Sequence, residues 1–282
     1  MSKTIISADS TCDLSSELVE KYGIKICRCP VIMGDKTFTD GIDVHPQDIF
    51  DYYEKTGNLA KTSAVNYQAY VNYFTPLTEG GNQVIHFCIS SDMSSMYNNA
   101  SVAAEDVGNV FVVDSRNLST AIGLQVLAAA ELAQRGESAE NIYNKMIALT
   151  EKVDASFVID TLTYLHKGGR CSTVAMLGAN VLKLKPSIEV KNGKMDVAKK
   201  YRGRIGDVAL EYAKNKLADL DTIDKHRCFV THTMGMGDEK AKAVYDYVVS
   251  LGYFDEVLET TAGCTVSAHC GPGTLGVLFI KK

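Results

Sequence analysis

His269 is a residue whose neighbours leave its chemistry open. It lies in the stretch SAHCGPGTLG, directly before a Gly-Pro-Gly turn that leads into an apolar strand. An imidazole there could bind a metal, activate a nucleophile, form part of a phosphate loop or hold an acid. We expect this glycine turn, and His269 with it, to lie near the surface.

Clusters of hydroxyl side chains supply further candidates. Thr62 and Ser63 stand just before a predicted helix, and SSDMSSMYNNA places four serines between a predicted strand and the next helix. Backbone N–H groups are free at helix starts, so both places suit an anion. Simple capping is the alternative, but it needs only one hydroxyl per helix, Ser94 or Ser95 in the second case. The surplus hydroxyls favour an anion-binding cleft.

Other patterns give weaker indications. Asp9 and Asp114 each end a predicted strand before a serine, which is typical of a turn cap; a metal ligand or a base is the alternative. The run GPGTLG fits G-x-G-x-x-G, but a dinucleotide site needs a strand before it and a helix after it. Here a strand follows, so we interpret the run as a tight turn. The six histidines have no metal-ligand spacing, and we predict no metal and no catalytic residue.

The composition is that of an ordinary soluble protein, with 46% hydrophobic and 22% charged residues. A formal net charge of −5 argues against nucleic acid or an anionic membrane as the main partner. We see no apolar leader and no run of about 18 apolar residues that could span a bilayer, and we expect a cytoplasmic protein. The eight cysteines include no C-x-x-C pair, which favours buried free thiols.

The first half of the chain alternates strands and helices. QVIHFCIS and NVFVVDS are typical of buried parallel strands, and helices are predicted at about 95–107 and 119–135. IKICRCPVIM is a further apolar run, turned at Gly34-Asp35. This order predicts an α/β fold whose first domain, residues 1–152, has three layers (α/β/α) and a mostly parallel sheet.

After about residue 150 strand candidates dominate, among them SFVID, HRCFVTHT, DEVLETT and TLGVLFI. Helices are predicted at about 204–218 and 237–250. Asn192-Gly193 indicates a hairpin, because a type I′ turn requires positive φ at both central residues. Residues 153–282 should therefore form an α+β domain with a mixed, partly antiparallel sheet. A cleft between two domains is a common place for a small ligand.

Eight short motifs run in one order along the chain: DSTCDL, TSAVNY, SSDMSSMYNNA, VVDS, LTYLHKGGR, LKPSIEVKNGK, YRGR and HCGPGTLGV. In this order the sequence resembles the DegV family, the bacterial fatty-acid-binding proteins that serve as the lipid-carrying subunit of fatty acid kinase. The resemblance implies a long-chain fatty acid in an apolar tunnel between two α/β domains. It also implies that the carboxyl group is presented to a separate ATP-dependent kinase, which makes an acyl phosphate for phospholipid synthesis.

The resemblance assigns the carboxylate site to Thr62, Ser94 and His269, with Ser63 and Ser95 as supporting hydroxyls. Two hydroxyls and an imidazole would supply three hydrogen-bond donors, so the head group would need no lysine or arginine. About fourteen buried methylenes at roughly 0.8 kcal/mol each give on the order of 11 kcal/mol before association costs. Chain burial should therefore dominate the affinity, and the head-group contacts should fix the orientation.

Two arginines, Arg170 in HKGGR and Arg202 in YRGR, match the family's basic positions and are candidates for contact with the kinase or its phosphates. A solvated basic loop is the alternative. The resemblance implies no cofactor, no ATP site of the chain's own and at most transient contact with a membrane. Two positions depart from the family pattern, because Ser95 stands where glycine is usual and Cys270 where threonine is common.

A function of another class remains possible on this evidence. A free-standing enzyme acting on a small carboxylated or phosphorylated metabolite would also use a cleft with hydroxyls and strand-end carboxylates. A nucleotide-binding regulator rests only on the glycine run. A long apolar cavity would favour the carrier, whereas a short polar pocket with converging carboxylates would favour the enzyme.

Overall fold

The computed structural model of the chain describes residues 3–175 and 184–282. The helices are α1 (Ser16–Tyr22), α2 (Pro46–Thr56), α3 (Tyr67–Thr78), α4 (Met96–Val107), α5 (Thr120–Gln134), α6 (Ala139–Thr150), α7 (Thr163–Gly168), α8 (Ser172–Ala175), α9 (Ile205–Lys216), α10 (Asp238–Ser250) and α11 (Cys264–Cys270). The strands are β1 (Thr4–Asp9), β2 (Lys25–Cys27), β3 (Pro30–Met33), β4 (Lys36–Thr39), β5 (Lys61–Thr62), β6 (Gln83–Cys88), β7 (Val110–Asp114), β8 (Val153–Asp154), β9 (Ser156–Val158), β10 (Leu184–Lys191), β11 (Lys194–Arg202), β12 (Ile223–His232), β13 (Glu256–Thr261) and β14 (Leu275–Lys281).

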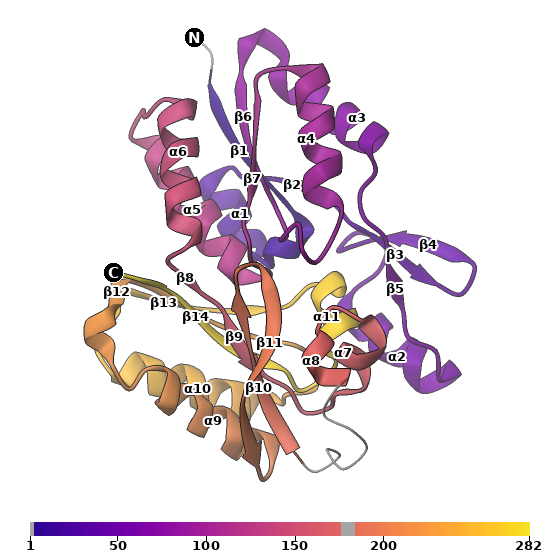
Figure 1. The fold of residues 1–282 in the computed structure, drawn as a ribbon, viewed down its shortest axis with the longest axis vertical. Coiled ribbons are helices and arrows are strands. Elements are labelled where there is room, and N and C mark those ends of the chain that lie inside the picture. Colours follow the sequence, from indigo (N-terminus) through magenta and orange to yellow (C-terminus); the bar gives the residue numbers. More distant parts are fainter. Residues whose placement is uncertain (1–2, 176–183) are drawn as a thin grey trace.

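The upper lobe in Figure 1 is a parallel sheet with helices on both faces. Its four strands pair in the order β2-β1-β6-β7, all parallel. Apolar side chains of α5 and α6 pack on one face, and those of α3 and α4 pack on the other. Because helices cover both faces of the sheet, the strand sequences are largely continuous apolar runs. The predicted three-layer α/β/α arrangement is confirmed.

The lower lobe contains a mixed sheet in the order β11-β10-β9-β14-β12-β13, with β8 also paired to β14. Strand β12 runs parallel to β13 and antiparallel to β14. The predicted hairpin joins β10 to β11, with φ of 50° at Asn192 and 80° at Gly193, as a type I′ turn requires. Helices α9 and α10 cover the outer face of this sheet. The predicted mixed sheet is confirmed.

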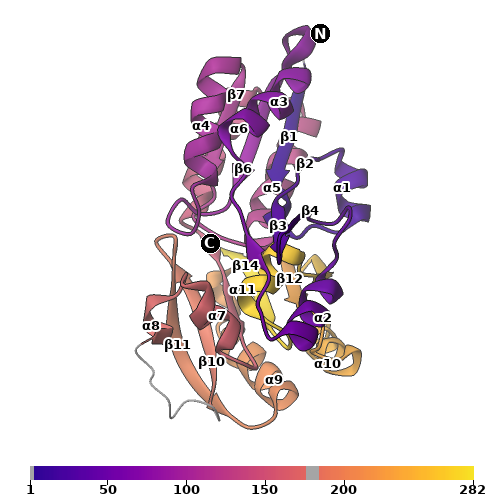
Figure 2. The ribbon, with the colours of Figure 1, turned by 90° about the vertical axis from the view of Figure 1, so that its right-hand side faces the viewer.

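Two segments differ from the sequence prediction. The run IKICRCPVIM divides into β2, which joins the parallel sheet, and β3, which pairs with β4 and β5 in a small antiparallel sheet. This small sheet and α2 extend from the upper lobe toward the lower one (Figure 2). Helix α11 occupies residues for which no helix was predicted, because seven residues rich in small and β-branched types carry little helical signal.

One hydrophobic core joins the two lobes. Val153, Ala155, Phe229 and Leu278 of the lower lobe belong to the same buried cluster as the apolar residues of β1, α5 and α6. A hydrogen bond of 2.6 Å between the hydroxyls of Thr120 and Thr231 also crosses this contact. The division of the chain at residue 152 stays a prediction.

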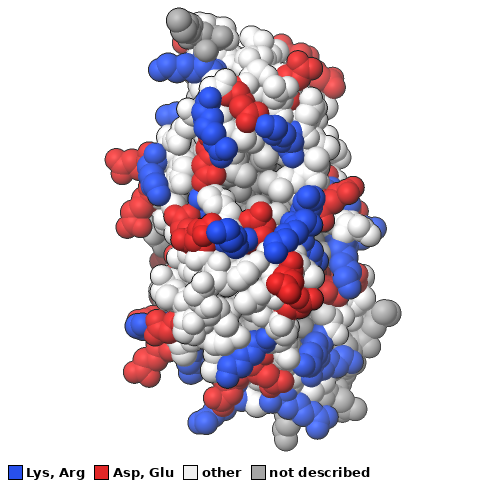
Figure 3. Space-filling view, turned by 90° about the vertical axis from the view of Figure 1, so that its left-hand side faces the viewer, with Lys and Arg blue, Asp and Glu red and all other residues white. Residues whose placement is uncertain are grey.

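Charges of both signs are interspersed over the face that carries α5 and α6, on the left in Figure 1 (Figure 3). This face therefore lacks the one-signed patch that a nucleic-acid-binding surface requires. Among the helices that the structure describes, none is both long enough and apolar enough to cross a membrane.

Candidate functional site

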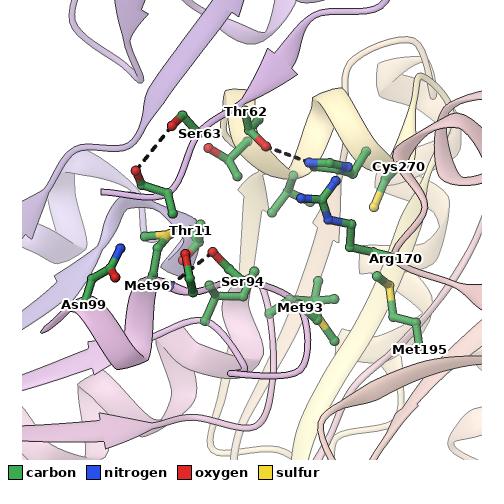
Figure 4. A pocket seen from close by; sticks show the side chains of 17 residues that line it. Thr11, Thr62, Ser63, Met93, Ser94, Met96, Asn99, Arg170, Met195 and Cys270 are labelled. Atoms are coloured by element: carbon green, nitrogen blue, oxygen red, sulfur yellow. Dashed lines mark hydrogen bonds between the residues drawn. The ribbon is translucent and has the colours of Figure 1, made fainter. Parts of the chain in front are cut away.

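A cavity of about 490 Å³ lies between the lobes and collects most of the predicted site residues. Its walls come from the upper lobe near β5 and the start of α4, and from the lower lobe at α11 and β11 (Figure 4). Thr62, Ser94 and His269, which are far apart in sequence, all line it. The structure thus brings the predicted trio to one cavity.

Thr62 and His269 are joined directly. Oγ1 of Thr62 lies 2.8 Å from Nε2 of His269 across 207 residues of sequence. Burial, together with the nearby Arg170 guanidinium, lowers the pKa of His269 to about 4, so the ring is neutral at pH 7. A neutral imidazole and a hydroxyl can each offer one proton to a carboxylate oxygen.

The expectation that His269 lies in the glycine turn itself is wrong, and its side chain is half-buried. The residue occupies the last turn of α11, and its Nδ1 atom is buried without a hydrogen-bond partner among the described residues. The glycine turn follows it and connects α11 to β14. A helix before the GPGTLG run and a strand after it reverse the order that a dinucleotide site needs.

Two buried carboxylates of the upper lobe hold the start of α11. Asp40 accepts hydrogen bonds from the backbone N–H of Cys264 (3.0 Å) and Thr265 (3.4 Å), and Asp13 accepts one from Gly263 (2.9 Å). These bonds satisfy N–H groups that a helix start leaves free. His269 therefore lies at the far end of a helix that is anchored to the upper lobe.

Among the described residues, the Ser94 hydroxyl makes one hydrogen bond, accepting from the N–H of Met96 at 3.3 Å. Ser95 stands at the N-cap position of α4, but its side chain makes no cap bond. Ser63 donates weakly to the carbonyl of Ala64 at 3.4 Å. Both Ser63 and Ser95 are exposed and line the cavity beside Thr62 and Ser94.

The other part of the cavity wall is apolar. In Figure 4, Met195 and Cys270 lie on the same side of the cavity as Arg170, with Met93 nearby, while Ser63 and Asn99 lie on the opposite side. The apolar lining is completed by Ala64, Ile89, Met96, Leu118 and Val266. No carboxylate lines the cavity among the residues that the structure describes. The space is therefore suited to an acid with an apolar chain rather than to carboxylate-based catalysis.

The two predicted arginines have different surroundings in the structure. Arg170 lines the cavity and also donates from Nη1 to the carbonyl of Gly168 at 2.7 Å. Arg170 therefore places a cation beside a head-group site that we expected to need none. Arg202 lies at the exposed end of β11 and does not line this cavity.

Sequence reasoning missed the apolar residues of the cavity wall and three polar ones, Thr11, Asn99 and Thr265. Thr11 is fully buried and its hydroxyl has no partner among the described residues. Asn99 donates to the carbonyl of Val65 at 2.8 Å and thereby ties α4 to the segment after Thr62. Thr11 belongs to the DSTCDL motif, so its position in that motif was the available signal.

The strand-end carboxylates have structural roles. Asp114 accepts from the backbone N–H groups of Ser91 and Arg116, which confirms the predicted turn cap. Asp9 does not cap its turn; it accepts from the hydroxyl of Tyr70 (2.7 Å) and lies 3.2 Å from His86.

Asp9, His86 and Cys88 are close enough to hold a metal ion, a grouping that sequence spacing did not reveal. Both ring nitrogens of His86 already have hydrogen-bond partners, Ser7 and Asp9. The cluster is therefore explained as a buried hydrogen-bond network under α3. All eight cysteines are free and buried, as predicted.

The family model described as "Uncharacterised protein, DegV family" matches residues 3–282. The chain belongs to the DegV family. It is 30% identical to a DegV domain-containing protein of Clostridium perfringens, with 100% of both chains covered.

Two solved structures resemble this fold closely. A DegV family protein of Thermus thermophilus, solved for its fatty acid binding, is 26% identical with a TM-score of 0.88, covering 99% of this chain and 100% of its own. A stearic-acid-binding protein of Eubacterium ventriosum is 28% identical with a TM-score of 0.85, covering 100% of this chain and 99% of its own. Members of this family thus bind fatty acids.

Proposed function

We propose that this protein binds a long-chain fatty acid in the cavity between its lobes and presents the carboxyl group to a separate ATP-dependent kinase. The observation that carries the proposal is one cavity lined by Thr62, Ser94 and His269 beside an apolar wall without carboxylates. The fatty acids bound by the Thermus and Eubacterium relatives support it.

The carboxylate would accept from the hydroxyls of Thr62 and Ser94 and from His269, replacing the Thr62–His269 bond of the free protein. Three donors offset the loss of water around the charge, and Arg170 adds a cation nearby. The acyl chain would lie against the apolar residues, where burial of each methylene contributes about 0.8 kcal/mol.

In the reaction itself, a carboxylate oxygen would attack the γ-phosphorus of ATP. A new carboxyl O–P bond forms, the bond from γ-phosphorus to the β–γ bridging oxygen breaks, and ADP leaves. Mg²⁺ and a phosphate cradle are needed for this step, and we assign both to the kinase. The present chain acts as carrier rather than enzyme, and we expect it in the cytoplasm with at most transient contact with membranes.

The test of binding is extraction of lipid from the purified protein, followed by mass spectrometry. A fatty acid of C14–C18, the chain length expected from the family, should be released in near-stoichiometric amount. Thr62→Val with Ser94→Ala should lower that amount or broaden the range of lipids recovered. Several preparations without bound lipid, and no uptake of added palmitate, would contradict the proposal.

Presentation to a kinase is tested separately with His269→Ala. Fatty acid should still bind within several-fold of the wild-type affinity, because chain burial dominates, while acyl phosphate formation with the partner kinase should fall at least tenfold. His166→Ala is the matched control, because that histidine is exposed and does not line the cavity. Equal turnover by His269→Ala and wild type would refute the role of His269.

The alternative of a free-standing enzyme has less support. Its candidate carboxylates, Asp9 and Asp114, make internal hydrogen bonds and do not line the cavity.

A further inference from the structure

A second cavity, of about 680 Å³, adjoins the first. Thr62, Arg170 and His269 line both. These three residues therefore form the boundary between the two spaces. A carboxylate held by Thr62 and His269 in the first cavity would lie at the edge of the second.

The second cavity has a different chemical character from the first. Lys61, Lys167 and Arg170 contribute three cations to its lining, against the single carboxylate of Asp35. None of the three cations forms an ion pair within 4.0 Å in the part of the chain that the structure describes, and Nζ of Lys167 lies 5.9 Å from the centre of the Tyr53 ring. The cavity therefore presents uncompensated positive charge.

The chain positions these cations with respect to the acid site. Lys61 immediately precedes Thr62 on β5, and Lys167 and Arg170 flank Gly168 and Gly169, the last residue and the C-cap of α7. A Cβ atom at Gly168 would lie only 2.6 Å from Nδ1 of His269. Glycine at this position thus lets the turn that carries both cations close directly onto the imidazole.

We propose that the second cavity binds the phosphoryl group of an acyl phosphate whose chain occupies the first cavity. Lys61 and Lys167 contact the phosphoryl oxygens, and Arg170 at the boundary contacts both ends of the mixed anhydride. Ammonium and guanidinium groups are the usual protein ligands of phosphate. A carboxylate ends at the boundary, whereas an acyl phosphate extends past it into the positively charged space. This inference rests on the proposed function and adds a product-binding site to it.

The experiment needs no kinase. Palmitate and hexadecyl phosphate, a stable stand-in for the acyl phosphate, are titrated calorimetrically below their critical micelle concentrations into delipidated protein. Three proteins are compared: wild type, the double variant Lys61→Gln/Lys167→Gln, and a control double variant, Lys152→Gln/Lys200→Gln. The control lysines are exposed and line neither cavity.

The double variant should bind palmitate within about twofold of wild type and hexadecyl phosphate about tenfold more weakly. The control should match wild type for both ligands. Failure of hexadecyl phosphate to bind wild type, or an equal effect of the double variant on both ligands, would overturn the inference while leaving palmitate binding intact. Absence of palmitate binding to wild type would instead refute the proposed function.

Discussion

His269 links the acid site to the protonation state of the protein. In the free chain its pKa lies near 4 because burial and the Arg170 cation disfavour the charged ring. A carboxylate bound against Nε2 acts in the opposite direction, since an anion stabilises imidazolium. Ligand binding should therefore raise the pKa of His269.

This change can be followed by NMR of histidine-labelled protein. Without ligand, the His269 ring signals should stay those of neutral imidazole from pH 8 down to about 5.5. With palmitate bound, the midpoint should move upward by about one unit or more. The exposed His45 supplies an internal control. Identical titrations with and without palmitate would mean that the carboxylate lies away from the ring.

The same low pKa affects stability. Between pH 6.5 and 4 the unfolded chain binds a proton at residue 269 that the folded chain does not, so the free energy of unfolding should fall as the pH falls. The full effect is on the order of 3 kcal/mol.

Buried Asp13 acts with the opposite sign. Burial raises its pKa to about 7, so between pH 3.8 and 7 the folded chain binds a proton at Asp13 that the unfolded chain does not, and the free energy of unfolding falls as the pH rises through this range. Urea unfolding of His269→Gln and wild type at several pH values isolates the histidine: the two curves should converge toward acid pH. Parallel curves would contradict the low pKa.

Among the elements that form the site, helix α11 depends most on hydrogen bonds to residues that are distant in the sequence. It has only seven residues, too few to be stable alone, and its N-terminal N–H groups bond to carboxylates from the other lobe. The chain thus uses Asp40 and Asp13 to fix a short helix whose last turn carries His269.

Asp40→Ala should lower the free energy of unfolding by about 2–4 kcal/mol, because it leaves buried N–H groups of Cys264 and Thr265 unpaired. Palmitate affinity should also fall, since α11 would no longer be held in position. Chemical denaturation and calorimetric titration measure the two effects. Asp219→Ala, at an exposed position, is the control and should change stability by less than about 0.5 kcal/mol. A loss below about 1 kcal/mol for Asp40→Ala would show that the cap is dispensable.

Many helices and strands could be predicted from the sequence, but the hydrogen bonds that hold the site residues in place could not. Helices expected at 95–107 and 119–135 occur as α4 and α5, since their apolar spacing and flanking turns are local signals. Asn192-Gly193 likewise fixes its turn type locally. The bonds from Asp40 to α11 join residues more than 200 positions apart, so spacing in the sequence carries no information about them. Thr62, Ser94 and His269 were found through ordered family motifs rather than through any geometric pattern.

At the scale of the whole molecule, the β10–β11 hairpin closes one side of the cavity. Met195 lines the apolar wall, and the turn beside it bonds to the upper lobe: Arg116 donates to the carbonyl of Asn192, and Ser90 donates to that of Gly193 at 2.7 Å. Arg116 also pairs with Asp92 at 2.5 Å. These contacts attach the hairpin to the upper lobe beside the apolar part of the cavity wall.

Arg116→Ala should weaken the attachment of the β10–β11 turn to the upper lobe, because it removes the hydrogen bond to the carbonyl of Asn192. We expect amide hydrogen exchange at residues 190–195 to become faster and bound palmitate to dissociate several-fold more quickly, with little change in global stability. Hydrogen-exchange mass spectrometry and a lipid-transfer assay measure the two rates. Arg135→Ala removes an exposed ion pair with Glu131 on α5 and is the control. Unchanged dissociation would mean that the ligand leaves by another side of the cavity.

The core shared by Phe229, Leu278 and the helices of the upper lobe would limit how the molecule takes up the proposed fatty acid. A hinge motion that parted the lobes would expose this core to water, at about 1.5–3 kcal/mol for each large side chain. Hinge opening of the two lobes, as in two-domain sugar- and amino-acid-binding proteins, is therefore too costly here. Entry and exit of a lipid must instead proceed through small, local displacements at the rim, with the body of the protein remaining closed throughout.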